Sequence, residues 1–199
     1  MPNWCSNNVE LTASTEKVVE FQKFLDEKKG ENWFDFFAPC PQELMDLGPV
    51  DPTNTNEELI EKYGYSDWYS FAISEWGCKW NCNAQSWDVE ELEEGKSVIK
   101  FWFDSPWGPP DILYGKINDP VDPEGWSVYA EWNEEGMQFV GYYDEGFGEN
   151  YEYDSLESLD NIPEFLVENW NIRERLEEWQ NEEEDYDIAV EIDEEEEKK

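Results

Sequence analysis

Residues 100–110, KFWFDSPWGPP, contain the change of direction around which the rest of the chain is organised. The stretch begins with the alternation of a β-strand, in which Phe101 and Phe103 point to one face and Trp102 points to the other. The prolines that follow cannot continue a hydrogen-bonded strand, but a proline pair is tolerated in the first turn of a helix. The stretch therefore predicts a strand, a rigid aromatic corner at Trp107, and a helix that begins near Pro109 or Pro110.

The segments on both sides of this stretch alternate between strand and helix patterns. Residues Thr15–Lys29 place apolar side chains at helical spacing and are followed by Gly30, which is typical of a helix end. A second, shorter helix is expected at Asp111–Asn118, directly after the prolines. The expected strands are Asn8–Thr12, Trp33–Phe37, Tyr69–Trp76, Asn81–Val89, Ser97–Phe103, Ser127–Asn133 and Phe139–Asp144.

This order of elements predicts an α+β fold. Two strand–helix–strand units in one antiparallel sheet, with the helices on one face, give a ferredoxin-like arrangement. We expect residues 1–150 to form this ferredoxin-like domain. Residues 41–66 have the character of an insertion, because glycine and proline interrupt them and Asn56–Tyr63 can form a short acidic helix.

The composition changes after residue 150. Residues 151–199 form an acidic C-terminal extension, with a helix expected at about 162–180 that could break near Asn171. Its apolar side chains are compatible with one stripe that either docks on the domain or faces a partner. The acidic end of the chain is expected to be a mobile tail.

Charge is the most unusual property of the whole sequence. The 199 residues contain 51 Asp and Glu against 13 Lys and Arg, which gives a net charge of -38, and His is absent. Such a chain repels phosphate backbones and anionic membranes, so direct binding of nucleic acid or membrane is not expected. It attracts basic proteins by electrostatic steering, although acidity can also serve solubility alone.

Four cysteines have no recognisable metal-binding spacing. Cys78 and Cys82 are separated by three residues, unlike the two-residue spacing of a zinc ribbon, and Cys5 and Cys40 lie far away in sequence. We therefore favour buried thiols in a reducing cytoplasm over a four-thiolate zinc site, and we expect no cofactor. The N-terminus shows no export signal, which also favours the cytoplasm.

Several short motifs occur in the order in which they occur in one known family. They are MPNWCSN at residues 1–7, FDFFAPCPQEL at 34–44, SEWGCKWN at 74–81, FDSPWGPP at 103–110 and EEGMQFVGYY at 134–143. The chain in this respect resembles the YubB/Api92-like ferredoxin-like family. The resemblance implies the ferredoxin-like fold and a protein of phage or plasmid type, and it implies no activity, because members of the family lack an established one.

Three functional hypotheses remain. In the first, the chain is a non-enzymatic protein that binds and inhibits a basic host protein. In one version of this hypothesis, the host protein handles nucleic acid, and the negative charge of the chain mimics that of DNA or RNA. In the second, an aromatic surface around Trp76, Trp80, Trp102 and Trp107 makes the contact and acidity only serves solubility. In the third, carboxylates and a divalent ion perform catalysis, although the absence of His removes the commonest general base.

We expect the partner-binding residues to be the acidic and aromatic side chains beside the motifs and in the tail. Glu75 and Asp104 also have a plain alternative role, in which they cap turns and pair with Lys79 or Lys100. The predicted contact residues are Trp76, Trp80, Trp107, Glu75, Asp104, Glu134, Glu135, Asp144, Glu145, Glu182, Glu183, Glu184 and Asp185.

Overall fold

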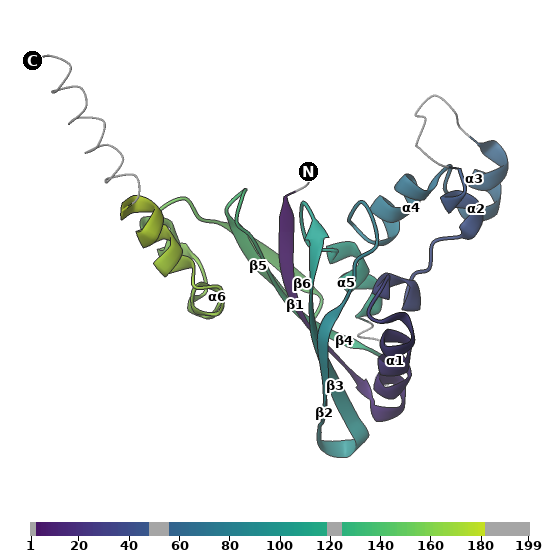
Figure 1. Cartoon of the computed structure of the whole chain (residues 1–199), viewed down its shortest axis with the longest axis horizontal. Helices are drawn as coiled ribbons and strands as arrows, with labels where there is room; N and C mark the ends of the chain where they lie inside the picture. Colours follow the sequence, from purple (N-terminus) through teal and green to yellow (C-terminus); the bar gives the residue numbers. More distant parts are fainter. Residues whose placement is uncertain (1–2, 48–55, 119–124, 182–199) are drawn as a thin grey trace, which may run out of the picture.

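The computed structural model describes residues 3–47, 56–118 and 125–181, and its centre is a six-stranded antiparallel sheet (Figure 1). The strands lie in the order β2-β3-β1-β4-β5-β6. Their bounds are β1 Trp4–Ser14, β2 Gln85–Glu91, β3 Lys96–Pro106, β4 Ser127–Glu134, β5 Phe139–Asp144 and β6 Phe147–Glu152. The helices are α1 Thr15–Lys28, η1 Trp33–Phe36, α2 Gln42–Met45, α3 Glu57–Tyr63, α4 Trp68–Glu75, η2 Glu93–Gly95, α5 Asp111–Ile117, η3 Glu157–Asn161 and α6 Glu164–Asn169.

The first four strands have the ferredoxin-like order. β1 lies between β3 and β4 and pairs with both in antiparallel fashion, while β2 pairs with the outer edge of β3. Helix α1 follows β1, and α5 connects β3 to β4, as in two interleaved strand–helix–strand units. The predicted fold class is therefore confirmed, and β5 and β6 extend the sheet beyond β4.

The strand–corner–helix prediction for residues 100–110 is also confirmed. Phe101 and Phe103 are buried in β3, whereas Trp102 on the other face is 39% exposed. The chain turns at Trp107, which has a φ of 71°, and α5 begins directly after Pro109 and Pro110. The Ser105 hydroxyl donates to the backbone carbonyl of Gly108 at 2.7 Å and thereby closes the corner.

Two predicted strands are wrong because local turns and caps outweigh their aromatic content. Residues Trp33–Phe36 form η1, in which the backbone N–H of Phe34 donates to Oδ1 of Asn81 at 3.1 Å instead of to a neighbouring strand. Residues Trp68–Glu75, which overlap the expected strand Tyr69–Trp76, form α4. Asp67 caps that helix by accepting from the backbone N–H of Ser70 at 2.8 Å.

Other boundaries differ less. The expected strand Asn81–Val89 is shifted, because β2 begins only at Gln85. Strand β6 was not predicted, and a tight turn in which Glu145 and Gly146 have φ values of 48° and 91° connects it to β5. The expected domain boundary after residue 150 lies inside β6.

The C-terminal helices pack on the face of the sheet opposite α1. Figure 1 shows α1 and α5 on one side of the sheet and α6 on the other. Helix α6 ends before Asn171, which has a φ of 49°, and a further helix covers 172–181, so the expected break near Asn171 is confirmed. Leu166 and Ile172 form a second small core with Val140 of β5. The predicted tail after residue 181 lies outside the described residues.

Candidate partner-binding surface

The sheet has one face that the helices α1 and α5 cover and one that they leave free. Along β1, Cys5, Val9 and Leu11 are buried in the main core, whereas Asn8 and Glu10 point to the other face and are only partly covered. The strand register then determines which residues of the other strands share this free face.

Acidic side chains from all six strands of the sheet lie on the free face. One cross-strand row joins Asp88, Lys100, Glu10 and Tyr129. The next row joins Trp102, Asn8, Glu131, Tyr142 and Glu149. We use the name acidic face for the set Glu10, Asp88, Glu90, Asp104, Glu131, Asp144 and Glu149.

Lys100 of β3 lies among these carboxylates. The Nζ atom of Lys100 lies 3.5 Å from carboxylate oxygens of both Glu10 and Glu90. Attraction to Glu10 and its hydrogen bonds to both carboxylates raise the pKa of Lys100. Lys100 thus offsets only part of the negative charge of the acidic face.

A groove of about 460 Å³ runs over the centre of the free face. Glu10 and Asp88 line it together with the exposed side of Trp102, and Asn169 at the end of α6 closes it. Asn169 donates to the two oxygens of Glu131 at 3.1 and 3.0 Å. The C-terminal helices therefore fix one wall of the groove and orient an acidic side chain in it.

Tyr129 also lines the groove and donates its hydroxyl to Glu131. Burial, followed by this hydrogen bond, raises the pKa of Tyr129, so the phenol stays neutral at physiological pH. Carboxylates beside an indole and a phenol favour cations, because the acids supply charge and the ring faces attract ammonium and guanidinium groups. The groove is chemically suited to a lysine or arginine side chain.

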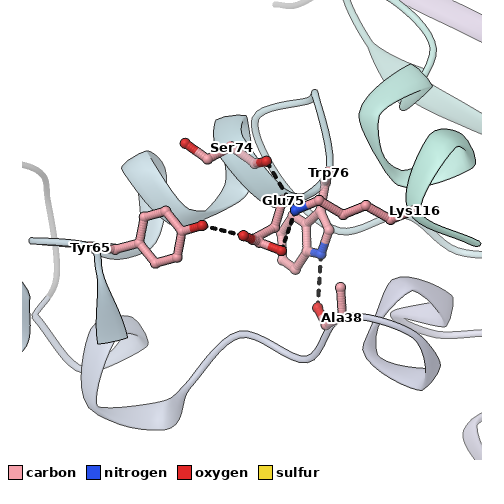
Figure 2. Close-up of polar contacts among 6 residues, drawn as sticks. All are labelled: Ala38, Tyr65, Ser74, Glu75, Trp76 and Lys116. Atoms are coloured by element: carbon pink, nitrogen blue, oxygen red, sulfur yellow. Dashed lines mark hydrogen bonds and ion pairs between the residues drawn. The ribbon is translucent and has the colours of Figure 1, made fainter. Parts of the chain in front are cut away.

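Glu75 and Trp76, two of the predicted contact residues, lie away from the acidic face and connect elements of the helical side (Figure 2). Glu75 accepts hydrogen bonds from the Tyr65 hydroxyl and the Lys116 ammonium group. Trp76 is only 3% exposed, and its indole N–H donates to the carbonyl of Ala38 at 2.9 Å. Trp76 is therefore a core residue and is not part of an exposed surface.

The pKa of Glu75 reflects these contacts. Partial burial pushes the pKa upward, but the hydrogen bonds from Lys116 and Tyr65 outweigh it and hold the pKa below its usual value. The same contact raises the pKa of Tyr65 to about 12. Lys116 also donates to the carbonyl of Ser74 at 3.2 Å, so this cluster holds α4 against α5. Glu75 therefore has a structural role, but its lysine partner is Lys116 and not the predicted Lys79 or Lys100.

Asp104 and Trp80 lie together at one end of the free face. Both line a cleft of about 430 Å³, where the Ser6 hydroxyl donates to Asp104 at 2.7 Å and the rings of Trp4 and Trp80 meet edge to face at 6.4 Å. Trp107 at the nearby corner is 49% exposed. These three predicted residues are accessible to a partner.

The remaining predicted residues are divided between interior and surface. Glu134 is 1% exposed and accepts from the backbone N–H groups of Gly136 and Met137 in the β4–β5 turn, so it cannot contact a partner. Glu135 is exposed and pairs with Arg175. Asp144 and Glu145 are exposed at the β5–β6 turn. Four further candidates lie outside the described residues: Glu182, Glu183, Glu184 and Asp185.

The prediction missed Glu10, Asp88, Tyr129 and Glu131 of the groove, and it missed Glu90, which pairs with Lys100. Their signal was present in the sequence as the polar half of each alternating strand, for example Asn8 and Glu10 in β1. Alternation shows that these residues share a face only when the strand register is known, and the sequence did not provide the register.

The four cysteines are not arranged for metal binding. Cys5, Cys78 and Cys82 are buried, and the thiols of Cys78 and Cys82 both point to the carbonyl of Trp80, at 3.3 and 3.7 Å. Burial raises the pKa of the half-buried Cys40 thiol to about 11. Within the described ranges, no cluster of three or more His, Cys, Asp or Glu side chains could hold a metal ion.

Comparisons with known proteins give a distant structural likeness. No family model and no curated protein matches the chain. Among solved structures, the chain is similar to the crystal structure of a protein api92 from Yersinia pseudotuberculosis, a DUF1281 protein, with 13% identity and a TM-score of 0.38. The match covers 78% of this chain and 99% of that chain. The fold assignment rests on the strand order itself. In the part of the chain that the structure describes, no helix is long and apolar enough to cross a membrane.

Proposed function

We propose that the protein is a non-enzymatic, phage- or plasmid-type protein that binds and thereby inhibits a basic host protein, and that the acidic face is the contact surface. The observation that carries the proposal is the gathering of carboxylates from six neighbouring strands on one face of a paired sheet. On α1, which covers the opposite face, Lys17, Lys23 and Lys28 nearly balance Glu16, Glu20, Asp26 and Glu27. The acidic face is thus more negative than α1 and would attract an approaching basic protein.

A sheet holds charges at fixed positions. Neighbouring strands lie about 4.8 Å apart and alternate residues along a strand about 6.6 Å apart, so same-face carboxylates form a dense array. Hydrogen bonds further restrain individual members, such as those from Asn169 to Glu131 and from Ser6 to Asp104. A preorganised array loses less conformational entropy on binding than flexible acidic side chains do. This favours recognition of a matching pattern of lysines and arginines.

A nucleic-acid-handling protein is the partner class that such an array fits best. Its basic groove evolved to neutralise closely spaced phosphates, and carboxylates of the acidic face would take the place of those phosphates. The groove beside Trp102 and Tyr129 would accept one of the partner's cationic side chains. Occupation of the basic groove would exclude the nucleic acid and explain inhibition.

Affinity capture with charge-matched variants tests this proposal. The acidic-face variant carries Glu10→Gln, Asp88→Asn and Glu90→Gln. The control carries Glu16→Gln, Glu20→Gln and Glu27→Gln on α1, where all three side chains are exposed. Both variants lose the same formal charge, so a difference between them reports position and not total charge.

We expect a basic protein to be captured by the wild type and the control, to be lost with the acidic-face variant, and to be displaced by added DNA or RNA. Equal retention by both variants would show that the acidic face is not the contact surface. Retention in the presence of excess nucleic acid would remove the mimicry part of the proposal.

An aromatic contact surface is the second candidate, because Trp4, Trp102 and Trp107 are 50%, 39% and 49% exposed. Large apolar side chains in the centre of an interface often dominate binding energy. In this case partner capture would survive high salt and both charge variants, and it would be lost with Trp102→Ala or Trp107→Ala.

A further inference from the structure

We propose that a second site, an aromatic pocket on the helical side of the molecule, binds a free organic cation of the quaternary-ammonium class. The pocket lies among η1, α2, α4 and the loop that follows α4, and it has a volume of about 680 Å³. The side chains that carry the argument are Asp35, Met45, Trp68, Trp76, Trp80 and Asn81. The pocket shares Trp80 and Asn81 with the cleft beside Asp104, whereas Asp35 lines this pocket and not that cleft.

The aromatic lining is held in place by the surrounding core. Trp76 is fixed by its hydrogen bond to Ala38, and its ring centroid lies 5.5 Å from those of both Phe34 and Phe71. Trp80 is braced by the edge of Trp4. A small-molecule site usually combines rigid aromatic walls with a few convergent polar groups, and here the polar groups are those of Asn32, Asp35, Gln42 and Asn81.

Trp80 already contacts a cation. The Nζ atom of Lys79 lies 5.0 Å from the centroid of a Trp80 ring, within the range of a cation–π interaction. Indole is the aromatic group that binds cations best, and three indoles line this pocket.

The charge of the lining is negative and its position is fixed. Asp35 is the one charged residue among the described residues that line the pocket. Asn81 donates its side-chain amide to Oδ1 of Asp35 at 2.8 Å. The amide oxygen of Asn81 meanwhile accepts from the backbone N–H groups of Phe34 and Cys82 at 3.1 and 2.9 Å. Both ends of the amide are therefore engaged, and the carboxylate is oriented before any ligand arrives.

Partial burial raises the pKa of Asp35, and attraction to Lys28 and the hydrogen bond from Asn81 oppose this shift. An anion would be repelled by Asp35 and by the net charge of -38. A metal ion would need several oxygen ligands, and Asp35 is the one carboxylate among the described lining residues, beside the amides of Asn32, Gln42 and Asn81. A quaternary ammonium ion carries its charge on methyl groups, so it can enter an apolar pocket and still be attracted by the carboxylate and the ring faces.

Calorimetric titration with choline tests the proposal, and 3,3-dimethylbutan-1-ol serves as the uncharged ligand of the same shape. The titrations use the full chain at about 0.15 M salt, which screens weak binding to exposed carboxylates. We expect choline to bind about tenfold more tightly than the neutral alcohol. In a spectrum of the indole N–H groups, the signals of Trp68, Trp76 or Trp80 should shift on addition of choline.

Variants locate the site. Trp80→Leu and Asp35→Asn should each weaken choline binding several-fold. In the Asp35→Asn variant, the affinity for choline should be close to the affinity for the neutral alcohol. The controls are Trp107→Leu, which removes an indole outside the pocket, and Asp154→Asn, which removes an exposed carboxylate, and both should leave choline binding unchanged. If Trp80→Leu fails to fold, Asp35→Asn decides the question, because it changes no volume.

Three results would overturn the inference: no choline binding, equal binding of choline and the alcohol, or equal effects of pocket and control variants. Trp80→Leu also alters the cleft beside Asp104, but Asp35→Asn does not, so the effect of Asp35→Asn on choline binding bears on this pocket alone. Failure of this proposal is therefore separable from failure of the proposed protein-binding function.

Discussion

At the scale of single residues, the environment of a side chain decides whether a carboxylate serves the fold or a partner. Glu131 and Glu134 lie on the same strand and both are nearly buried, yet Glu131 faces the groove and Glu134 holds the next turn. The sequence shows only that both are glutamates near aromatic residues. The contact roles of the accessible residues Asp104 and Asp144 stay predictions, whereas Glu134 has a structural role that the sequence did not distinguish from them.

Glu75→Gln should destabilise the protein at neutral pH and have little effect in acid. The pKa of Glu75 is held below its usual value, so its contribution is present at neutral pH and is lost as the pH falls through the folded-state pKa. Because the site is partly exposed, we expect a loss of about 1 kcal/mol. Urea unfolding at neutral and acidic pH measures the difference, and a loss of equal size at both would contradict the assigned ion pair.

Trp102→Ala should weaken partner binding without destabilising the fold. Trp102 is 39% exposed and lines the groove, so its removal should change the free energy of unfolding by only about 0.5 kcal/mol or less. Trp107→Ala, at the exposed corner outside the groove, is the matched control. Binding measurements that show loss only with Trp107→Ala would place the contact at the corner instead.

At the scale of elements, the sequence predicts those segments whose pattern agrees with their local capping signals. The strand in residues 100–110 and helix α1 follow directly from alternation, helical spacing and end signals. The segments η1 and α4 were wrongly predicted as strands, because their aromatic residues are typical of strands. In the structure, Asn32 forms a turn before η1 and Asp67 caps the N-terminus of α4. Tertiary contacts such as that from Phe34 to Asn81 decide the outcome, and they cannot be seen in the sequence.

Asp67→Ala should destabilise the protein by about 1 kcal/mol through loss of the N-cap of α4. Asp67 accepts from the backbone N–H of Ser70 at 2.8 Å, and hydrogen bonds hold its pKa below the usual value against the opposing effect of burial. Asp154→Ala, at an exposed position that caps no helix, is the control. Equal unfolding midpoints for the two variants in urea would show that the cap is unimportant.

Gly141→Ala should weaken the pairing of β5 with β6. A Cβ at this position would lie 2.3 Å from the carbonyl oxygen of Glu149 and 2.7 Å from the ring of Trp132, so backbone must move. Overpacking of this kind costs about 1–3 kcal/mol. Gly108→Ala meets no atom within 4 Å and should leave thermal stability nearly unchanged, and similar melting temperatures for the two variants would contradict the tight β5–β6 contact.

At the scale of the whole molecule, charge and fold act against each other. A net charge of -38 on 199 residues destabilises the compact state by self-repulsion, while the aromatic core and the sheet stabilise it. The amount of charge follows from the sequence alone. Which carboxylates share a face depends on the strand register. The sequence therefore predicted a strongly acidic molecule, but it did not predict which residues form the acidic face.

Salt should therefore stabilise the isolated protein. At 0.1 M salt, repulsion between exposed carboxylates more than about 10 Å apart is largely screened. The melting temperature should therefore rise with ionic strength. Calorimetry in a sodium chloride series measures this. A melting temperature that stays constant or falls would mean that the carboxylates are already neutralised within the fold.

The salt dependence of affinity for the captured partner tests the central claim most directly. For the wild type and for the α1 control variant (Glu16→Gln, Glu20→Gln, Glu27→Gln), affinity should fall steeply as salt increases. For the acidic-face variant (Glu10→Gln, Asp88→Asn, Glu90→Gln), affinity should be lower and its salt dependence clearly weaker. Parallel salt dependences for all three proteins would contradict the claim that the acidic face recognises the partner.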